Sequence, residues 1–192
     1  MYSYLEQVSI PTDGQGRNLG LINSNLNPMR DSELSRWILD ERMESYVCNH
    51  DTRGHMVSDL HRYFFCSSWA KVVEEGEELG TFSPRSKHYP KVLIPNHANF
   101  KSGKFADRFR VQAGSQSAKT MTCHISKDGH AFIHYDPLQC RSFTVREAAR
   151  IQTFPDNYFF VGTRTNQYVQ VGNAVPPFLA SKIANVVFNV LG

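Results

Sequence analysis

The chain has 192 residues, 41% of them hydrophobic, and a formal net charge of +3, which suits one ordinary domain or two small ones with a core. This mild positive charge excludes an arm that binds nucleic acid by charge alone. No run of about 18 apolar residues occurs and the N-terminus lacks the pattern of a signal peptide, so we expect a soluble protein of the cytoplasm that makes no contact with a membrane.

Two helices are predicted in the N-terminal half. Residues 1–30 are rich in Pro, Gly, Asn and Ser and are expected to be irregular or short-stranded. Apolar residues at near-helical spacing predict a helix from about Asp31 to Tyr46, with Asp31 or Ser32 as the N-cap. A second helix is predicted from about Met56 to Val73.

The pattern then changes from helical to strand-like. The prolines around YPKVLIPNH, residues 89–97, break any helix and predict one short buried strand. Alternating β-prone residues predict two more strands at 105–111 and 120–125. Lys-Asp-Gly at 127–129 is a turn signal, and residues 131–135 are a candidate return strand of a hairpin.

A basic segment coincides with these predicted strands. Between Lys101 and Lys127 the chain holds six basic residues and a single acid. On a strand, Arg108 and Arg110 would point to one face and Phe109 to the other. One face could then meet phosphate while the other meets a core. The alternative is an ordinary solvated sheet face.

The C-terminal third has the clearest local signals. Thr144 and Glu147 have the spacing of a capping box, which predicts a helix that starts there and stops by Pro155. The last helix is predicted to begin after Pro176 and Pro177 and to run toward Leu191. Its polar positions are few, so it must be covered on most sides, and residues 1–140 lack the βαβ signals of a sheet that would cover it. Alternatively, it is the core of a small independent domain.

Residues 141–184 read RSFTVREAARIQTFPDNYFFVGTRTNQYVQVGNAVPPFLASKIA. This stretch closely resembles the last two shared motifs of cytosine-5 DNA methyltransferases, with TVREAARIQTFP and QVGNAVPP at the proper distance before a terminal helix. Three upstream segments resemble the target-recognition region of one bacterial branch of that family: NHDTRGHM (49–56), DRFRVQ (107–112) and KTMTCHISKDGHAFIH (119–134). The resemblance is strong over the C-terminal third and looser from about residue 45.

The resemblance implies an α+β fold in two parts. Residues 1–140 would form a small, mixed target-recognition domain of strands, loops and two helices. Residues 141–192 would carry the C-terminal methyltransferase motifs, a capping helix and a terminal helix, which complete an α/β (Rossmann-like) methyltransferase domain. The helix like TVREAARIQ would be the mount of the recognition domain, with Arg146, Glu147 and Arg150 structural and Arg150 able to pair with Glu147.

The segment like GNAV lies against S-adenosylmethionine in such enzymes, so Asn173 and Val175 are the candidate cofactor-binding residues. Their chemistry agrees with this role: Gly172 allows close approach of the backbone, Asn173 offers a donor and an acceptor, and Pro176 stiffens the turn. Without the flanking match, the segment would be interpreted as a plain loop before a helix.

The expected partner is double-stranded DNA. Basic side chains and hydroxyls would position phosphates, and the turn at 127–129 could approach base edges in the major groove. The candidate DNA-binding residues are Arg108, Arg110, Lys119, Thr120, Thr122 and Lys127.

The chemistry of the family is missing from this sequence. The resemblance implies a Pro-Cys nucleophile, a Glu-Asn-Val motif and a glycine-rich cofactor turn, yet no cysteine follows a proline and no Glu-Asn dipeptide occurs. No catalytic residue is therefore assigned. We expect the DNA-recognition and cofactor-closing part of a DNA (cytosine-5-)-methyltransferase of restriction-modification type, inactive without a catalytic N-terminal methyltransferase polypeptide. The alternatives are a non-enzymatic, sequence-specific DNA-binding protein and a truncated remnant.

The four cysteines form no CxxC pair and are expected to be free thiols. Several of them lie near histidines, which raises zinc as an alternative. Their spacing fits no pair of ligand knuckles, so no metal is predicted. The residues concerned are Cys48, His50, His55, His61 and Cys66.

Overall fold

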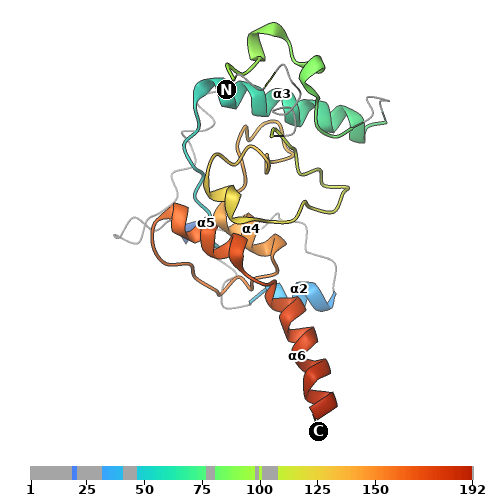
Figure 1. Ribbon diagram of the computed structural model, residues 1–192, viewed down its shortest axis with the longest axis vertical. Helices are drawn as coiled ribbons and strands as arrows, with labels where there is room; N and C mark the ends of the chain where they lie inside the picture. Colours follow the sequence, from blue (N-terminus) through green and yellow to red (C-terminus); the bar gives the residue numbers. More distant parts are fainter. Residues whose placement is uncertain are drawn as a thin grey trace. The chain divides into compact units, whose positions relative to one another are not determined.

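The computed structural model describes residues 19–20, 32–40, 47–76, 81–97, 100 and 108–191 (Figure 1). Contacts divide the chain into two compact units. Unit 1 spans residues 1–51, 121–126 and 144–192, and unit 2 spans residues 52–120 and 127–143. The units therefore interleave along the sequence, and a boundary between residues 140 and 141 stays a prediction.

Helices dominate the described residues, which contain little strand. Unit 1 holds α2 (Glu33–Ile38), the 3-10 helix η4 (Cys123–Ser126), α4 (Val145–Ile151), α5 (Arg164–Asn173) and α6 (Pro177–Leu191). Unit 2 holds α3 (Val57–Glu74) and the 3-10 helices η2 (Ser86–His88) and η3 (Lys91–Leu93). Strands β1 (Leu19–Gly20) and β2 (Val47–Cys48) pair antiparallel in unit 1, with Leu19 opposite Cys48.

Local capping signals predicted the helix starts well. Ser32 is the N-cap of α2 and forms a capping box with Ser35, and Thr144 does the same for α4 with Glu147. Helix α3 follows Met56 as predicted, and α6 begins at Pro177. Helix α2 ends at Ile38, earlier than expected, while residues 41–46 of that prediction lie outside the described residues.

The predicted strands of unit 2 are wrong where the structure describes them. Residues 89–97 contain η3 instead of a buried strand, and the Val92 side chain is 87% exposed. Pro90 and Pro95 have no amide hydrogen to donate to a sheet, which favours short 3-10 turns there. The segments at 108–111 and 131–135 form no regular strands: they meet in an isolated parallel bridge between Val111 and Ile133, beside a hydrogen bond from the amide of Arg110 to the carbonyl of His130. The strand predicted at 120–125 is also wrong, because residues 123–126 form η4 of unit 1. Residues 105–107 lie outside the described part.

The core of unit 2 is built on α3. Tyr63, Cys66 and Ala70 lie along one side of this helix and are buried. They pack in one cluster with side chains from the irregular segments: Tyr89, Phe100, Phe109, Val111 and Ile133. The Ser67 hydroxyl also donates to the carbonyl of His134, at 2.7 Å. In its described part, unit 2 is thus one α-helix covered by loops and short 3-10 turns, whose mostly aromatic side chains fill its core.

A buried arginine holds unit 1 together. Arg146 on α4 is 1% exposed, and its Nε donates to the carbonyl of Cys48 at 3.0 Å. Its Nη1 donates to the carbonyl of Pro155 at 3.1 Å, and Nη2 to the carbonyl of Tyr158. The guanidinium therefore joins β2, α4 and the loop after α4.

Neighbouring residues extend this network. Asp156 lies 4.0 Å from Arg146 and accepts two hydrogen bonds of 2.8 Å from Arg150. The structural role expected for these residues is confirmed, but Arg150 binds Asp156, and Glu147 closes the capping box of α4. Asn49 adopts a positive φ of 58°, and its amide exchanges two hydrogen bonds of 3.0 Å with the backbone of Phe160.

Substitution of Arg146 by Met should destabilise unit 1 by about 3–5 kcal/mol, because the buried carbonyls and Asp156 lose their charged partner. Urea unfolding of the full chain, followed by the fluorescence of Trp37 and Trp69, measures the effect. Arg164→Met is the matched control, since Arg164 is exposed and lies 4.0 Å from Asp51, a pair worth about 1 kcal/mol or less. Equal stabilities of the two variants would contradict this role of Arg146.

Candidate functional site

The GNAV segment is fixed against η4. A Cβ atom at Gly172 would lie 2.4 Å from the backbone nitrogen of Cys123 and from the carbonyl carbon of Thr122. Only glycine permits this approach, so the close backbone packing expected at Gly172 is present, and its partner is this chain's own backbone. Sequence reasoning missed α5, which carries this glycine, although Thr163 caps the helix by accepting from the amide of Asn166.

The two candidate cofactor residues, Asn173 and Val175, come shortly after Gly172 in the sequence. Asn173 ends α5 and is exposed, and the Val175 side chain is 65% exposed. The segment is held from inside the unit, because the Gln152 amide donates to the carbonyls of Val171 and Ala174, at 3.1 and 3.3 Å. The amide of Asn173 and the isopropyl group of Val175 are thus accessible to a ligand, on a segment that hydrogen bonds hold in place. Together they can form one wall of a pocket.

The contacts that attach α6 to other described residues come from its first two turns. The amide of Phe178 donates to the Thr153 hydroxyl at 3.1 Å, and its ring packs on Trp37 with centroids 5.6 Å apart. Lys182 forms an ion pair with Glu33 of α2. No residue of α6 is buried, and Phe188 and Leu191 are 75% and 81% exposed.

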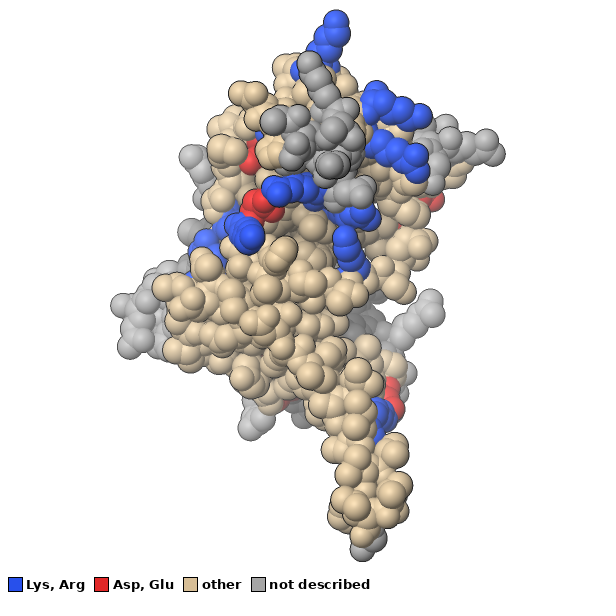
Figure 2. Space-filling view, in the orientation of Figure 1, with Lys and Arg blue, Asp and Glu red and all other residues tan. Residues whose placement is uncertain are grey.

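The exposed surface of α6 is a continuous apolar face. In Figure 2 the helix is almost entirely uncharged. One side forms a shallow apolar groove, lined by Val175, Ala180, Ile183, Ala184, Val187, Phe188 and Leu191. We expected another element to cover this helix. Among the described residues of this chain, no element does so.

By length and apolar composition, one run of the described residues, Arg164–Leu191, could cross a membrane. This run is two helices, broken at residues 174–176, and Tyr168 and Val171 of α5 are buried inside unit 1. The remaining helix, α6, is about 22 Å long, shorter than the roughly 30 Å of a bilayer core. The run therefore does not indicate a membrane protein.

The predicted turn at residues 127–129 is confirmed in unit 2. Gly129 has a φ of +76°, and a Cβ there would lie 2.6 Å from the Ser142 hydroxyl, so the position requires glycine. Arg53 donates to the carbonyl of Lys127 at 3.0 Å, and the amide of His130 donates to the Asp128 carboxylate at 3.1 Å. The exposed Lys127 side chain thus projects from a well-held turn.

A chain of hydrogen bonds supports this turn from α3. The Tyr63 hydroxyl lies 2.7 Å from Nδ1 of His130 and 3.4 Å from Nδ1 of His55, while Nε2 of His55 lies 3.2 Å from the Ser142 hydroxyl. Burial, and then the charge of Arg53, lower the pKa of His55 to about 4. Burial also lowers the pKa of His130, so both rings are neutral at pH 7.

The six predicted DNA-binding residues lie at three places. Arg108 and Lys127 belong to the turn region, where Arg108 lies 3.8 Å from Asp128. Arg110 and Lys119 line a pocket of unit 2, and Thr120 is exposed next to it in sequence. Thr122 belongs to unit 1, beside Gly172. Figure 2 shows Lys and Arg side chains gathered on the face of unit 2.

The residues of the zinc alternative do not come together. All four cysteines are free, and the described residues contain no cluster of three potential metal ligands. Cys48 lies in unit 1, where its sulfur accepts from Arg146. Cys66 lies in the core of unit 2, where burial raises the pKa of its thiol to about 12 and disfavours the thiolate that zinc binds.

Comparison with known proteins decides the family. A family model described as C-5 cytosine-specific DNA methylase matches residues 23–189 of this chain. The chain belongs to this family.

Three relatives show how the match is distributed. M.Bpa9945I, a type II methyltransferase of Bacillus paralicheniformis, is 56% identical over 98 residues, which are 51% of this chain and 22% of the relative. M1.HphI, a type II methyltransferase of Haemophilus parahaemolyticus, is 45% identical over 146 residues, 76% of this chain and 32% of the relative. The chain thus spans a fifth to a third of the length of these two methylase relatives.

The third relative has a different extent. M.AquIB, a type II methyltransferase of Picosynechococcus sp., is 39% identical over 153 residues, which are 74% of this chain. The match covers 88% of M.AquIB itself. A methylase polypeptide of nearly the same extent as this chain therefore exists.

Substitution of Gly172 by Ala should destabilise unit 1 by about 1–3 kcal/mol or more, because the added methyl group overlaps the backbone of η4. The urea unfolding midpoint of the full chain measures the loss. Gly114→Ala is the control, since nothing lies within 4 Å of a Cβ there. A midpoint for Gly172→Ala that equals the control's would show that η4 does not pack on α5.

Acid should weaken unit 2 through His55. Its pKa is about 4 in the folded chain and about 6.5 ordinarily, so between these values the unfolded chain binds more protons. The free energy of unfolding should therefore fall as pH drops from 6.5 to 4. His55→Gln should decline less over this range, while His61→Gln, at an exposed position of α3, should decline like the wild type in urea titrations at each pH. Parallel curves for wild type and His55→Gln would contradict a buried neutral ring.

Proposed function

We propose that this chain is the DNA-recognition and cofactor-closing part of a DNA (cytosine-5-)-methyltransferase of restriction-modification type that uses S-adenosylmethionine and acts in the cytoplasm. It acts together with a catalytic N-terminal methyltransferase part that carries the Pro-Cys nucleophile. The observation that carries the proposal is an uncovered apolar helix, α6, on a methylase-family chain whose sequence has no Pro-Cys dipeptide.

The missing part is the cover of α6. An apolar helix face left in water costs about 25 cal/mol for each Å² that could be buried, so a stable assembly places it against another apolar surface. The family implies a Rossmann-like methyltransferase domain, in which helices pack on a parallel sheet. The catalytic part would supply this sheet, and α6 would complete one of its layers.

The same assembly would close the cofactor site. Asn173 and Val175 lie at the base of α6 on the rigid support of η4 and Gln152. With the sheet docked on α6, these side chains would form one wall for S-adenosylmethionine, and the catalytic part would form the other. Bound there, S-adenosylmethionine supplies the methyl group, and the proposed role of this chain is to enclose it.

Unit 2 would bind the DNA duplex. Its well-held turn at 127–129 would approach base edges, with Lys127 and Arg108 beside it. Arg110, Lys119 and Thr120 of unit 2, together with Thr122 of unit 1, are the further contact residues that we propose, chiefly to the backbone. The extent of M.AquIB supports a separate polypeptide of this kind.

The direct test is co-expression in a host that lacks cytosine methylation. The chain is expressed alone, with a methyltransferase polypeptide that supplies the Pro-Cys and Glu-Asn-Val motifs, or with that polypeptide's Cys→Ala variant. Bisulfite sequencing of host DNA should show methylated cytosines only in the intact pair. Methyl transfer by the chain alone would overturn the proposal, and sequence-specific DNA binding without any methylation by the pair would favour the non-enzymatic alternative.

Charge on the apolar face of α6 should separate assembly from folding. Ile183→Glu with Val187→Glu should abolish co-purification of the two parts and methylation, because two carboxylates would be buried at the interface. Helix content and unfolding midpoint of the chain alone should stay unchanged, since neither residue is buried in it.

The matched control is Asn185→Glu with Asn189→Glu, which adds the same charge to the polar positions of the same helix. This variant should assemble and methylate like the wild type. Equal activity of both double variants would remove α6 as the docking element.

A further inference from the structure

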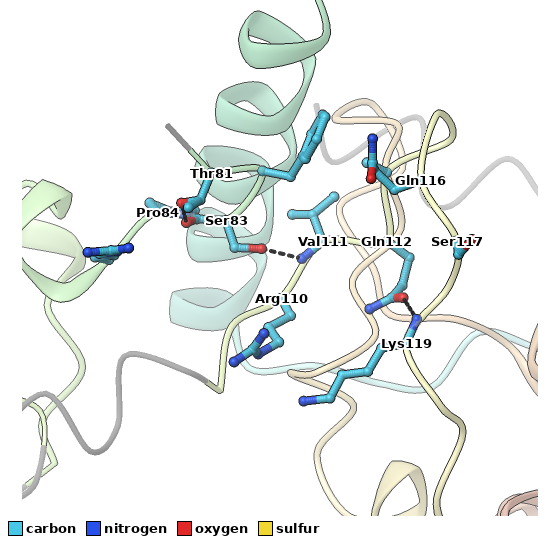
Figure 3. A pocket seen from close by; sticks show the side chains of 12 residues that line it. Thr81, Ser83, Pro84, Arg110, Val111, Gln112, Gln116, Ser117 and Lys119 are labelled. Atoms are coloured by element: carbon cyan, nitrogen blue, oxygen red, sulfur yellow. Dashed lines mark hydrogen bonds between the residues drawn. The ribbon is translucent and has the colours of Figure 1, made fainter. Parts of the chain in front are cut away.

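A pocket in unit 2 lies between two segments that sequence reasoning did not connect (Figure 3). Residues 81–85 form one wall, and residues 110–119 form the other, within a volume of about 530 Å³. Arg110 and Lys119, already candidates for DNA contact, extend toward the same side of it. The opposite segment contributes Arg85, which no sequence motif singled out.

The described lining of this pocket carries charge of one sign. Among the residues that the structure describes, it contains three cations, Arg85, Arg110 and Lys119, and no carboxylate. Arg85 and Lys119 are exposed and have no ion-pair partner among the described residues, whereas Arg62, Arg146 and Arg150 all lie against an aspartate. Cations gathered in a concave surface without an acid create a positive potential that attracts an anion.

Hydrogen bonds hold both walls of the pocket in place. The Gln112 amide donates to the carbonyl of Ala131 at 2.8 Å, and its oxygen accepts from the amide of Lys119 at 2.9 Å. The Ser83 hydroxyl oxygen accepts from the amide of Val111 at 3.0 Å, which leaves its proton to donate elsewhere. The nearby acid, Glu74, binds the amide and the hydroxyl of Ser115 instead of a cation.

The remaining lining distinguishes a nucleotide chain from a bare ion. Phe82, Pro84, Val111 and Ala113 give the pocket apolar surface against which a sugar can pack. The volume is many times the roughly 30 Å³ that one water molecule occupies, which leaves room for more than a single anion. Gln112, the amide best suited to read a base edge, has both ends engaged within the protein.

We propose that this pocket binds the sugar–phosphate backbone of one strand of the DNA duplex. Arg110, Lys119 and Arg85 would pair with phosphate oxygens, and the Ser83 hydroxyl would donate to one of them. The pocket would position the duplex without reading its sequence, while the turn at 127–129 is left to contact bases. This inference rests on the proposed function of the chain.

The test uses the wild-type chain assembled with its catalytic part. Binding to a duplex that contains the methylated site and to a scrambled duplex is measured by fluorescence anisotropy over a series of salt concentrations. Arg85→Gln and Lys119→Gln alter exposed side chains, so their thermal unfolding should match the wild type. Lys71→Gln and Lys91→Gln, at exposed positions of unit 2 outside the pocket, are the charge-matched controls.

Each pocket variant should weaken binding of both duplexes by the same factor, about five- to tenfold near 0.1 M salt, and reduce the slope of log K against log salt by about 0.9. The controls should change neither. An unchanged slope, a loss confined to the specific duplex, or an equal loss in the controls would overturn the pocket assignment.

The alternative ligand of this pocket is a free anion, and a separate titration tests for it. Inorganic phosphate titrated without DNA should not protect the wild type from thermal unfolding more than it protects Lys119→Gln. Selective protection at millimolar phosphate, with duplex binding unaffected by the variants, would identify a free-anion site and overturn the proposal. If the wild-type assembly neither binds nor methylates DNA, the proposed function itself fails, whereas insensitivity of an active assembly to the pocket variants refutes only the pocket.

Discussion

The structure of unit 1 depends on the hydrogen bonds that backbone carbonyls provide to one buried guanidinium, that of Arg146. Arg146 is inside the protein and its charge is stabilised by carbonyls that come from β2 and from the loop after α4, with Asp156 close by. A buried charge without such partners would cost several kcal/mol, so these segments must be in place together. Because α5 follows this loop, the position of the GNAV segment depends on the same contacts. The proposed cofactor wall is therefore supported by residues far from it in sequence.

The described polar groups inside unit 1 have hydrogen-bond partners, whereas the apolar surface of α6 is exposed to solvent. Hydrogen bonds of Gln152, Asn49 and Arg146 leave few polar groups of unit 1 without partners, yet α6 exposes an apolar face from its second turn onward. Such a contrast agrees with the proposal that this chain is one part of a larger domain, in which the polar network is complete within the chain and the hydrophobic layer would be completed by the other part. It also explains how the chain can hold a defined fold at the base of α6 while the helix itself lacks contacts.

Helix caps and turns, which depend on residues close together in the sequence, could be predicted. Strand pairing and the pocket, which depend on residues far apart in the sequence, could not. The N-cap predicted at Asp31 or Ser32, the capping box at Thr144 and the glycine turn at 129 are local, and the structure confirms them, with Ser32 as the cap. The strand predictions failed because strand-like alternation needs a pairing partner, which the prolines and loops of unit 2 do not supply where the structure describes them. Arg85 could not be predicted as a pocket residue, since only the fold brings residues 81–85 to residues 110–119. The cofactor residues were predicted from the family resemblance, and the DNA residues from the basic segment together with that resemblance.

The interleaving of the two units bears on how such proteins could exchange sequence specificity. The polypeptide passes between the units at residues 51/52, 120/121, 126/127 and 143/144, and the excursion at 121–126 forms η4, against which Gly172 packs. A recombination event that replaces residues 52–143 as one block would import a foreign η4 beneath the GNAV segment. Grafts that transplant residues 52–120 and 127–143 while retaining the native 121–126 would preserve the packing of Gly172 on η4. Under the proposed function, this would be a rule for building chimeric enzymes with new target sites.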